Sequence, residues 1–422
     1  MSIADALNDD LAAEFPAAFR ALSRLGRRIY FPQGIPAQSA DARGTRYNAT
    51  IGQVTDGHGS PTPLPAIAEA FAGLDAHKSH LYSPPAGHGD LRRAWADRQR
   101  ALSGGSTAPT TLPFVCIGLT QVLSFAAELF VDEDTPVLVP APRWGNYDQV
   151  FVTRRGGRLV EYDLFDGREL TLEPLRQTLA ATEGPAMVVL NFPHNPSGMT
   201  PDAATAAELV DLVLAHPGPL VVLVDDAYAG MAWDDQLPGR SLFWDLAERH
   251  DPDKHVILRA DGVTKELLFF PGRVGFLTIA CDPASKSAAA FESKLAGLAR
   301  SGNGSPPGPS QAAVLHALTH PDLDQQLTEA RAVLQARFDR LSAALAAAQS
   351  DRLRPYPFNS GVFAMVGLPD DLDSEEVRKR LIAEQSLGLV RLGGLNALRI
   401  AWCSVAEEDI DGLVGALVEG LG

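Results

Sequence analysis

The chain has 422 residues, of which 45% are hydrophobic and 21% charged, and its formal net charge at pH 7 is −16. This length allows a large core and more than one domain, and the negative charge argues against nonspecific binding to nucleic acid or to an anionic membrane. The three cysteines are few, widely spaced and odd in number, which fits reduced thiols. No apolar run approaches the length of a membrane span and the N-terminus lacks a signal-peptide pattern, so we expect a cytoplasmic protein.

The N-terminal part contains one helical pattern and one glycine at a strand end. Leu7, Leu11 and Phe15 recur at helical spacing, which predicts one amphipathic helix over residues 4–26. We expect its apolar face to pack against the body of the protein or against a partner subunit. Further on, residues 48–52 end at Gly52, where the backbone can approach a ligand closely or simply leave a strand.

Two further helices are predicted over residues 64–74 and 88–103. His77, His80 and His88 lie in or near the connection between them. No carboxylate or cysteine completes a recognisable set of metal ligands with these histidines. We therefore expect solvated loop histidines and no metal site.

From about residue 113, short apolar runs alternate with helical segments. The expected strands are Phe114–Ile117, Val137–Val139, Leu159–Tyr162, Met187–Leu190, Leu220–Val224 and Val256–Leu258. Such alternation predicts an α/β fold in which helices cover both faces of a mainly parallel sheet, giving three α/β/α layers.

The alternation stops after residues 306–309, and the last part mixes short strands with helices as in an α+β domain. We therefore divide the chain into three parts. Residues 1–59 form an N-terminal arm and contribute to the small domain, residues 60–325 form the large domain, and residues 326–422 form the small C-terminal domain.

Unusual residues stand directly after the expected strands, at the edge where open α/β sheets bind ligands. Gly118, Leu119 and Thr120 lie between a strand and a helix, where backbone N–H groups bind phosphate or where the chain simply turns. Trp144 and Asn146 follow the next strand. A tryptophan there can cover a flat aromatic ligand whose edge the amide would bind, although a core tryptophan is the commoner case.

Two further motifs are more specific. The run Asn195-Pro196-Ser197-Gly198 rigidifies a loop, so that Asn195 can donate a hydrogen bond to a phenolate-like oxygen. Asp225 ends a very apolar strand, where a carboxylate is costly to bury unless a cation meets it. A protonated pyridine nitrogen would supply that cation, and Tyr228 would bond the hydroxyl of the same ring.

A single lysine, Lys265, follows another apolar strand among small and apolar neighbours. Burial lowers the pKa of a lysine, which then attacks a carbonyl and forms a Schiff base. Arg273, a short distance along the chain, would hold a planar anion such as phosphate. A lysine, an acid, ring-oxygen donors, a stacking ring and a phosphate cup are what pyridoxal phosphate requires, so the sequence predicts this cofactor.

The same motifs resemble those of one protein family. They are Asn195-Pro196-Ser197-Gly198, Asp225-Asp226-Ala227-Tyr228 and Thr264-Lys265 followed by Gly272-Arg273. In order and spacing they resemble the class I/II aminotransferases, fold type I enzymes that depend on pyridoxal phosphate, and the resemblance covers about residues 48–399. It implies that Lys265 binds the cofactor and moves the substrate proton, that Asp225 keeps the ring nitrogen protonated, and that Asn195 and Tyr228 hold the ring oxygen.

The resemblance also implies the remaining contacts. They are stacking by Trp144, phosphate binding by Gly118, Leu119, Thr120, Thr264 and Arg273, and binding of the substrate α-carboxylate by Arg399 with Gly52 and Asn146 beside it. Tyr82 resembles a tyrosine that reaches the phosphate of the neighbouring subunit, which implies a homodimer with shared active sites. The expected reaction transfers an amino group between an amino acid and a 2-oxo acid.

Two departures and two alternatives accompany this prediction. Gly262 stands where the family often has a serine, so one phosphate hydroxyl is expected to be missing. No clear second arginine is placed to read a side-chain carboxylate, so a preference for dicarboxylic substrates is unsupported. A pyridoxal-phosphate-dependent lyase or decarboxylase remains open, because these enzymes share the ring chemistry. A ligand-sensing regulator is disfavoured, because the residues before Asn48 show no helix-turn-helix pattern.

Overall fold

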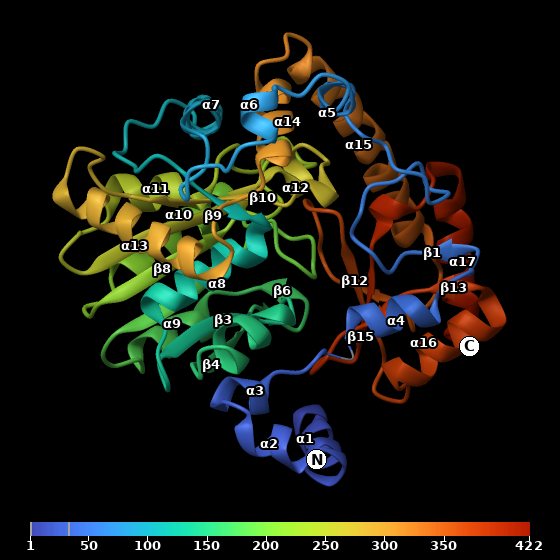
Figure 1. Ribbon diagram of the computed structural model, residues 1–422. Coiled ribbons are helices and arrows are strands. Elements are labelled where there is room, and N and C mark those ends of the chain that lie inside the picture. The colour runs from blue at the N-terminus through green and yellow to red at the C-terminus, as the bar shows by residue number, and fades with distance from the viewer. Residues whose placement is uncertain (1, 33) are drawn as a thin grey trace.

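The structure, a computed structural model, describes residues 2–32 and 34–422 and is built on a seven-stranded sheet. The strands lie in the order β2-β10-β9-β8-β7-β3-β4 (Figure 1). They span Phe114–Ile117 (β2), Pro136–Ala141 (β3), Arg158–Asp163 (β4), Ala186–Leu190 (β7), Leu220–Asp225 (β8), His255–Gly262 (β9) and Val274–Ile279 (β10). Only β10 runs antiparallel to its two neighbours, β2 and β9, which confirms the predicted mainly parallel sheet.

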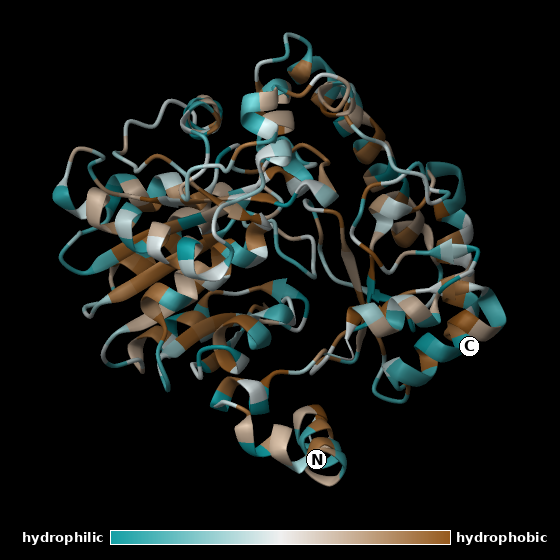
Figure 2. Cartoon of the chain, in the orientation of Figure 1, coloured by the Kyte–Doolittle hydropathy of each residue, from teal (hydrophilic) through white to brown (hydrophobic). Residues whose placement is uncertain are grey.

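Helices cover both faces of this sheet because successive strand residues point to opposite sides. On β7, Met187 and Val189 pack into one apolar cluster, while Val188 and Leu190 pack into another. The first cluster is covered by α8 (Gly118–Phe130) and α13 (Lys286–Gly302), and the second by α9 (Glu173–Ala180), α10 (Ala203–Leu214) and α11 (Leu242–Arg249). The strands between these layers are almost uniformly apolar, as Figure 2 shows, so burial on both faces explains their composition.

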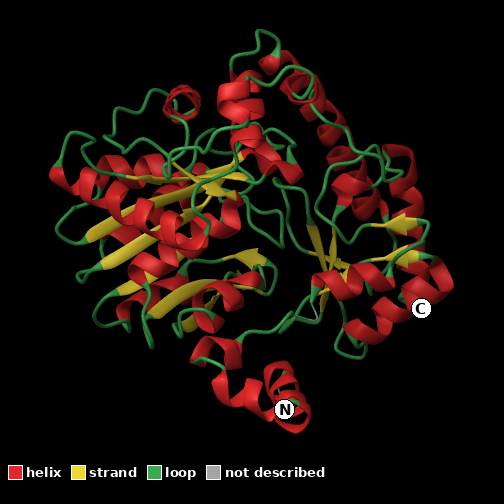
Figure 3. Cartoon of the chain, in the orientation of Figure 1, coloured by secondary structure: helices red, strands yellow, loops and turns green. Residues whose placement is uncertain are grey.

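A second, antiparallel sheet lies beside the first one, at the centre right of Figure 3. Its order is β11-β12-β15-β14, with bounds Arg354–Pro355 (β11), Ala364–Gly367 (β12), Ala397–Ile400 (β15) and Val390–Arg391 (β14). The helices α15 (Leu323–Ala347), α16 (Ser374–Gln385) and α17 (Ile410–Gly420) surround it. An N-terminal strand, β1 (Tyr47–Asn48), pairs in parallel with β13 (Leu387–Gly388), so the early chain joins the C-terminal part.

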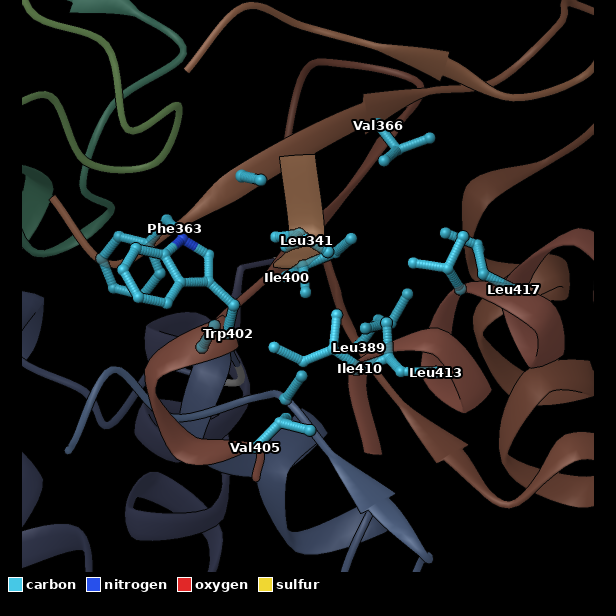
Figure 4. Packing of buried hydrophobic residues seen from close by; sticks show 14 of the residues in the cluster. Leu341, Phe363, Val366, Leu389, Ile400, Trp402, Val405, Ile410, Leu413 and Leu417 are labelled. Atoms are coloured by element: carbon cyan, nitrogen blue, oxygen red, sulfur yellow. The ribbon is translucent and has the colours of Figure 1, made fainter. Parts of the chain in front are cut away.

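The core around this second sheet includes residues from distant parts of the chain. Phe363 and Trp402 lie at one end of the cluster, and Leu413 and Leu417 of α17 lie at the other end (Figure 4). Tyr47 belongs to the same cluster. The N-terminal strand is therefore held by apolar packing as well as by its backbone pairing.

The N-terminal helix predicted over residues 4–26 is wrong in its extent, because the structure has three helices there. These are α1 (Ile3–Glu14), α2 (Pro16–Ala21) and α3 (Arg24–Arg28). Pro16 cannot continue the first helix, since it lacks the N–H group that the next turn needs, and Ser23 starts α3 by accepting a hydrogen bond from the N–H of Gly26.

The apolar face of these helices does not pack against the body of this chain, and the alternative, packing against a partner subunit, stays a prediction. Leu7 is 47% and Phe15 is 61% exposed. In Figure 1 the helices α1 and α2 stand apart from the rest of the chain. Only α3 approaches the large sheet, through a surface ion pair between Arg24 and Glu133.

The remaining helices are short. They are α4 (Ile35–Asp41), α5 (Pro65–Ala70), α6 (Ala76–Ser79), α7 (Gly89–Ala101), α12 (Val263–Glu266) and α14 (Gly308–Leu318). A π-helical segment at Asp148–Thr153, 3₁₀ segments at Phe270–Gly272, Trp402–Ser404 and Glu407–Asp409, and the hairpin strands β5 (Phe165–Asp166) and β6 (Glu169–Leu170) complete the elements. The predicted helix over residues 64–74 is thus a shorter helix followed by α6, whereas the one over residues 88–103 agrees with α7 to within two residues. Within the described residues, no helix has the length and apolar character that crossing a membrane requires.

Candidate active site

The carboxyl ends of β7, β8 and β9 bring the candidate residues together. Asp225 is the last residue of β8, Asn191 follows β7 directly, and Lys265 lies on α12 just after β9. The three strands are parallel neighbours, with Leu190 of β7 paired to Val224 of β8. Their ends therefore meet at one edge of the sheet, which is where α/β folds bind ligands.

Asp225 is a buried carboxylate held by hydrogen bonds. The Tyr147 hydroxyl donates to its Oδ2 at 2.6 Å, and the Ala227 N–H donates to its Oδ1 at 3.3 Å. The Asn191 side chain donates to the Asp225 main-chain oxygen at 2.9 Å. Burial raises the pKa of Asp225 to about 6, while the Tyr147 hydrogen bond acts in the opposite direction. Among the described residues Asp225 has no ion pair, which leaves the carboxylate open to a cationic ring nitrogen.

Lys265 has the character of a reactive lysine. The pKa of its ammonium group is lowered to about 8, chiefly by burial, while the Asp225 charge acts to raise it and the Arg273 charge to lower it. Its Nζ lies 5.2 Å from the centre of the Tyr228 ring. Tyr228 itself is buried and packs edge-to-face against Phe363 at 5.6 Å. The structure thus places Lys265 near both Asp225 and Tyr228, while their roles stay a prediction.

Gly118 and Arg273 form a cradle at the start of α8. The helix begins at Gly118, so the turn expected over residues 118–121 is instead its first turn, and the N–H groups there have no partner within the helix. Gly118 has φ of 70°, and a Cβ atom placed on it would lie 2.2 Å from Nη2 of Arg273. The guanidinium therefore lies directly over the glycine, beside the helix N-terminus, in an arrangement that suits a phosphate.

Gly262 lacks the expected hydroxyl because a side chain has no room there. A Cβ atom at Gly262 would lie 2.7 Å from the Val274 oxygen, 2.8 Å from Leu119 Cδ1 and 2.9 Å from Gly275 Cα. Gly275 is its partner across the β9–β10 pair, and a Cβ atom there would lie 2.6 Å from the carbonyl carbon of Gly118. Close packing of these glycines accounts for the departure.

Arg399 is a buried arginine that no carboxylate neutralises within the described residues. Its Nη2 donates to the Thr50 oxygen at 2.7 Å, and its Nη1 lies 3.5 Å from Asn195 Oδ1. The guanidinium carbon lies 4.2 Å from the centre of the Phe363 ring, and the buried Nε has no hydrogen-bond partner. Burial lowers the pKa of Arg399 to about 10. An unpartnered donor on a buried cation fits a bound carboxylate.

Gly52 lies against Phe363, the aromatic residue beside Arg399, because a Cβ atom on Gly52 would be 2.4 Å from the Phe363 ring. The backbone of Asn195 is fixed by a hydrogen bond, because its N–H group donates to Asn191 Oδ1 at 2.9 Å. The loop that carries it is tied to the second sheet region, since Gly198 accepts hydrogen bonds from the N–H groups of Asn359 and Ser360. Both sheets therefore position the residues around Arg399.

The other predicted residues differ in how closely they approach Asp225, Lys265 and Arg399. Trp144 packs edge-to-face on Tyr147 at 5.7 Å and, with Asn146, lines a cavity of about 940 Å³. Thr264 is buried beside Lys265, and Thr120 is exposed on the first turn of α8. Tyr82 is 99% exposed and touches none of the other candidate residues.

Three residues escaped the prediction. They are Tyr147, Asn191 and Phe363, which contact Asp225, Asn195 and Arg399. Tyr147 stands three residues after Trp144, and Asn191 is the first polar residue after a fully apolar strand, so both had a detectable signal. Phe363 had none, because an aromatic residue in an apolar segment reads as ordinary core.

The arrangement fits pyridoxal phosphate, since an unpaired acid and the arginine of an anion cradle lie near a lysine of lowered pKa. Comparison with known proteins agrees. A family model for aminotransferases of class I and II matches residues 47–417. The chain belongs to this family. It is a pyridoxal-phosphate-dependent aminotransferase, which confirms the predicted family, cofactor and enzyme class.

Individual relatives show how far the similarity extends. The chain is 28% identical over 315 residues to the aspartate/prephenate aminotransferase of Thermus thermophilus, covering 74% of this chain and 75% of the relative. It is 30% identical over 195 residues to a probable N-succinyldiaminopimelate aminotransferase of Mycobacterium tuberculosis, covering 46% and 48% of the two chains.

Solved structures confirm the fold. An aminotransferase from Anaerococcus prevotii superposes with a TM-score of 0.80 at 19% identity, covering 93% of this chain and 98% of the other. The kynurenine aminotransferase of Pyrococcus horikoshii gives a TM-score of 0.79 at 18% identity, covering 96% and 97%.

Proposed function

We propose that Lys265 binds pyridoxal phosphate covalently and that the residues around it transfer an amino group between an amino acid and a 2-oxo acid. The observation that carries this proposal is the set of three charged side chains, Asp225, Lys265 and Arg399, that meet without ion pairs among the described residues. Buried charges without partners are costly in a protein that binds nothing. A ring nitrogen, an aldehyde and an α-carboxylate would satisfy them one by one.

Arg399 would bind and orient the substrate. Its buried Nε is unpartnered and its Nη1 is only weakly engaged, so it has donors free for an α-carboxylate. The contacts with Thr50 and Phe363 hold the guanidinium in place before substrate arrives. Gly52 and Asn146 would lie beside the same carboxylate. Such preorganisation turns binding energy into orientation of the bond that breaks.

Lys265 would move the substrate proton. With a pKa of about 8, roughly a tenth of its Nζ is neutral at pH 7, far more than for an ordinary lysine, and this form can accept a proton from the substrate Cα. When bound, pyridoxal phosphate supplies an aldehyde for the amino group and a ring that withdraws electrons from Cα. Asp225, held by Tyr147, would keep a proton on the ring nitrogen.

The remaining residues would hold the cofactor. Asn195 and Tyr228 would donate hydrogen bonds to its ring oxygen, and Trp144 would stack on its ring. The phosphate would rest on the N–H groups at the start of α8, against the Arg273 guanidinium and beside Thr264. Leu119 and Thr120 would contribute backbone groups only, so the nature of their side chains matters little to this role.

We also propose a homodimer in which Tyr82 reaches the partner's phosphate. Its side chain is 99% exposed, and its neighbour Leu81 is 62% exposed. Adjacent large apolar side chains of this kind are typical of a surface that another protein covers. Sedimentation equilibrium would give twice the chain mass if the proposal is right.

We also propose the domain division and the cellular location that the sequence predicts. The division into residues 1–59, 60–325 and 326–422 is supported by separate apolar clusters around the two sheets, with β1 joining the second one. A cytoplasmic location is supported by the three cysteines, which are all free thiols.

The test compares Lys265→Ala with Lys294→Ala, whose lysine is exposed on α13. Borohydride should fix the cofactor to wild type and to Lys294→Ala but not to Lys265→Ala, and peptide mass spectrometry should place the label on Lys265. An amino acid alone should then convert the cofactor to its amine form. Equal labelling of Lys265→Ala would refute the assignment, and release of ammonia in place of the amine form would favour a lyase.

A further inference from the structure

A large cavity borders the proposed reacting centre at Trp144 and Asn146. Its volume is about 940 Å³, which is at the upper end for small-molecule sites. Five parts of the chain enclose it: the N-terminal segment around α4, the segment after β3, β4 with the β5–β6 hairpin, Tyr356 after β11, and β14 with the loop that follows it. A substrate held at Arg399 would extend its side chain into this space.

One wall of the cavity is aromatic and apolar. Phe165 on the β5–β6 hairpin and Tyr356 after β11 pack edge-to-face at 5.3 Å, and Leu392 and Leu395 pack in the same cluster. Arg168 of the hairpin donates to the Pro355 oxygen at 3.1 Å, which fixes the hairpin to the small sheet. The apolar wall is therefore formed in advance and spans both sheets.

Only one arginine of the cavity is largely buried, and its donors are already used. The Arg143 side chain is 15% exposed. Its Nη1 and Nη2 donate to the two carboxylate oxygens of Asp148 at 2.6 and 3.1 Å, and its Nε donates to Glu161 at 3.0 Å. One guanidinium thus lies between two carboxylates, with a net charge of −1 for the three groups.

The other charges of the cavity do not reverse this balance. Asp163 adds a carboxylate, and the exposed Arg391 adds a cation, so three acids face two arginines among the lining residues. Gln38 holds the Arg391 backbone through two hydrogen bonds of 2.7 and 3.2 Å, which keeps that residue on the side of β14. A second carboxylate on the substrate would meet acids and an occupied arginine.

We propose that this cavity receives the substrate side chain and selects large uncharged aromatic or aliphatic side chains over acidic ones. The proposal rests on the proposed function, because it takes the centre beside Trp144 as the site of reaction. Selection would come from two terms: burial of apolar surface against Phe165 and Tyr356, and repulsion of an added carboxylate by Asp148, Glu161 and Asp163. Aspartate, which the name of the Thermus thermophilus relative includes, would then be a poor substrate of this chain.

The first experiment measures kcat/KM of the holoenzyme for phenylalanine, tyrosine and leucine against aspartate, glutamate and lysine. We expect the value for phenylalanine to exceed that for aspartate by at least about tenfold. Unreactive analogues give a second readout, since 3-phenylpropionate should bind more tightly than succinate in calorimetry. Faster reaction with aspartate, glutamate or lysine than with phenylalanine would overturn the proposal.

The second experiment frees Arg143 by changing Asp148→Asn and Glu161→Gln together. The ratio of kcat/KM for aspartate over phenylalanine should rise by about tenfold or more, because the guanidinium gains open donors. Glu128→Gln is the matched control, since Glu128 pairs with Arg154 outside the cavity and its change should leave the ratio unaltered. An unchanged ratio in the double variant would count against the proposal.

Phe165→Ala tests the apolar wall. We expect KM for phenylalanine to rise by about tenfold while KM for alanine changes little, since only the larger side chain reaches the wall. Equal changes for both substrates would refute this contact.

These outcomes separate the two proposals. If no donor converts the cofactor to its amine form, the proposed function itself fails. If acidic donors react best, the aminotransferase assignment stands and only the selectivity fails. Loss of activity toward acidic donors in Arg391→Ala would then identify the arginine that reads them.

Discussion

Two polar regions meet at the ends of β8 and β9, and their charges are arranged in opposite ways. On the side of the active site, Asp225 accepts a hydrogen bond from the neutral Tyr147 and has no ion pair among the described residues. On the other side, the adjacent Asp226 forms a buried ion pair with Arg259, which also lies 3.1 Å from Asp261. Consecutive strand residues point to opposite faces, so one strand end supplies both carboxylates.

The rear network connects several elements around α12. Arg259 donates to Gln99 on α7 at 2.8 Å, and Gln99 in turn donates to Glu266 at 2.8 Å. Trp95 of α7 donates to Asp261 at 3.1 Å. Lys265 and Glu266 are thus arranged like Asp225 and Asp226. In each pair the first residue lies in the active site, and the second belongs to the rear network. Paired charges stabilise the scaffold, and unpaired ones are available to ligands.

The largest expected effect is on stability, from Asp226→Asn. The change removes one of the two carboxylates that compensate Arg259 and leaves only Asp261, so we expect the free energy of unfolding to fall by about 2–3 kcal/mol. Urea denaturation of the apoprotein measures this change. Asp211→Asn, which breaks an exposed pair with Arg249, should cost less than about 1 kcal/mol. Similar losses in both variants would contradict the distinction between the two regions.

Asp225→Asn should show the reverse pattern. Loss of the carboxylate that holds a proton on the ring nitrogen should lower kcat by about 10²–10³-fold. Because Asp225 has no ion pair to lose, the free energy of unfolding of the apoprotein should not fall by more than about 1 kcal/mol. A stability loss as large as that of Asp226→Asn would show that Asp225 is a structural residue.

Glu266→Gln tests the rear network through pH. Burial, with Asp261 second, raises the pKa of Glu266 from 4.5 to about 7. Between these values the folded protein binds more protons at this group than the unfolded chain does, so its contribution lowers stability as pH rises from about 4.5 to 7. In the wild type this group should make the protein about 1–3 kcal/mol less stable at pH 8 than at pH 5, and Glu266→Gln should remove that contribution. Thermal unfolding at the two pH values measures it, and an unchanged difference would place the titration elsewhere.

The smallest effect is expected from Tyr147→Phe. The hydrogen bond from Tyr147 lowers the pKa of Asp225, so its removal should raise that pKa above about 6. The acidic limb of the kcat/KM profile should move to higher pH by roughly one unit, which costs about fivefold at pH 6. A uniform loss at all pH values would indicate a packing defect instead.

The strands and the site residues after them could be predicted because each has a local signal. A run such as Met187–Leu190 is apolar throughout, and Asp225 and Lys265 break such runs with charges. The N-terminal helix was predicted too long because the apolar spacing of Leu7 and Phe15 continues through a proline that ends it. Spacing describes one face of a helix and contains no information on where the chain bends.

The contacts across the structure could not be predicted. Tyr147 meets Asp225 from 78 residues away, and Phe363 meets Arg399 through a second sheet. The sign of a charge is local, but its pairing depends on tertiary packing. Nothing in the sequence distinguishes the open Asp225 from the paired Asp226, although the two are adjacent.

The packing of Gly118, Gly262 and Gly275 limits how this lineage can change. Shortening Leu119 would remove one obstacle to a serine at position 262, but the Val274 oxygen and Gly275 Cα would remain at 2.7 and 2.9 Å. A serine gained there by a single mutation would push β10 away from β9 before its hydroxyl could contact phosphate. A side chain at position 262 therefore requires β10 and the start of α8 to shift together, so the three glycines fix the distance between this strand pair and the Gly118–Arg273 cradle.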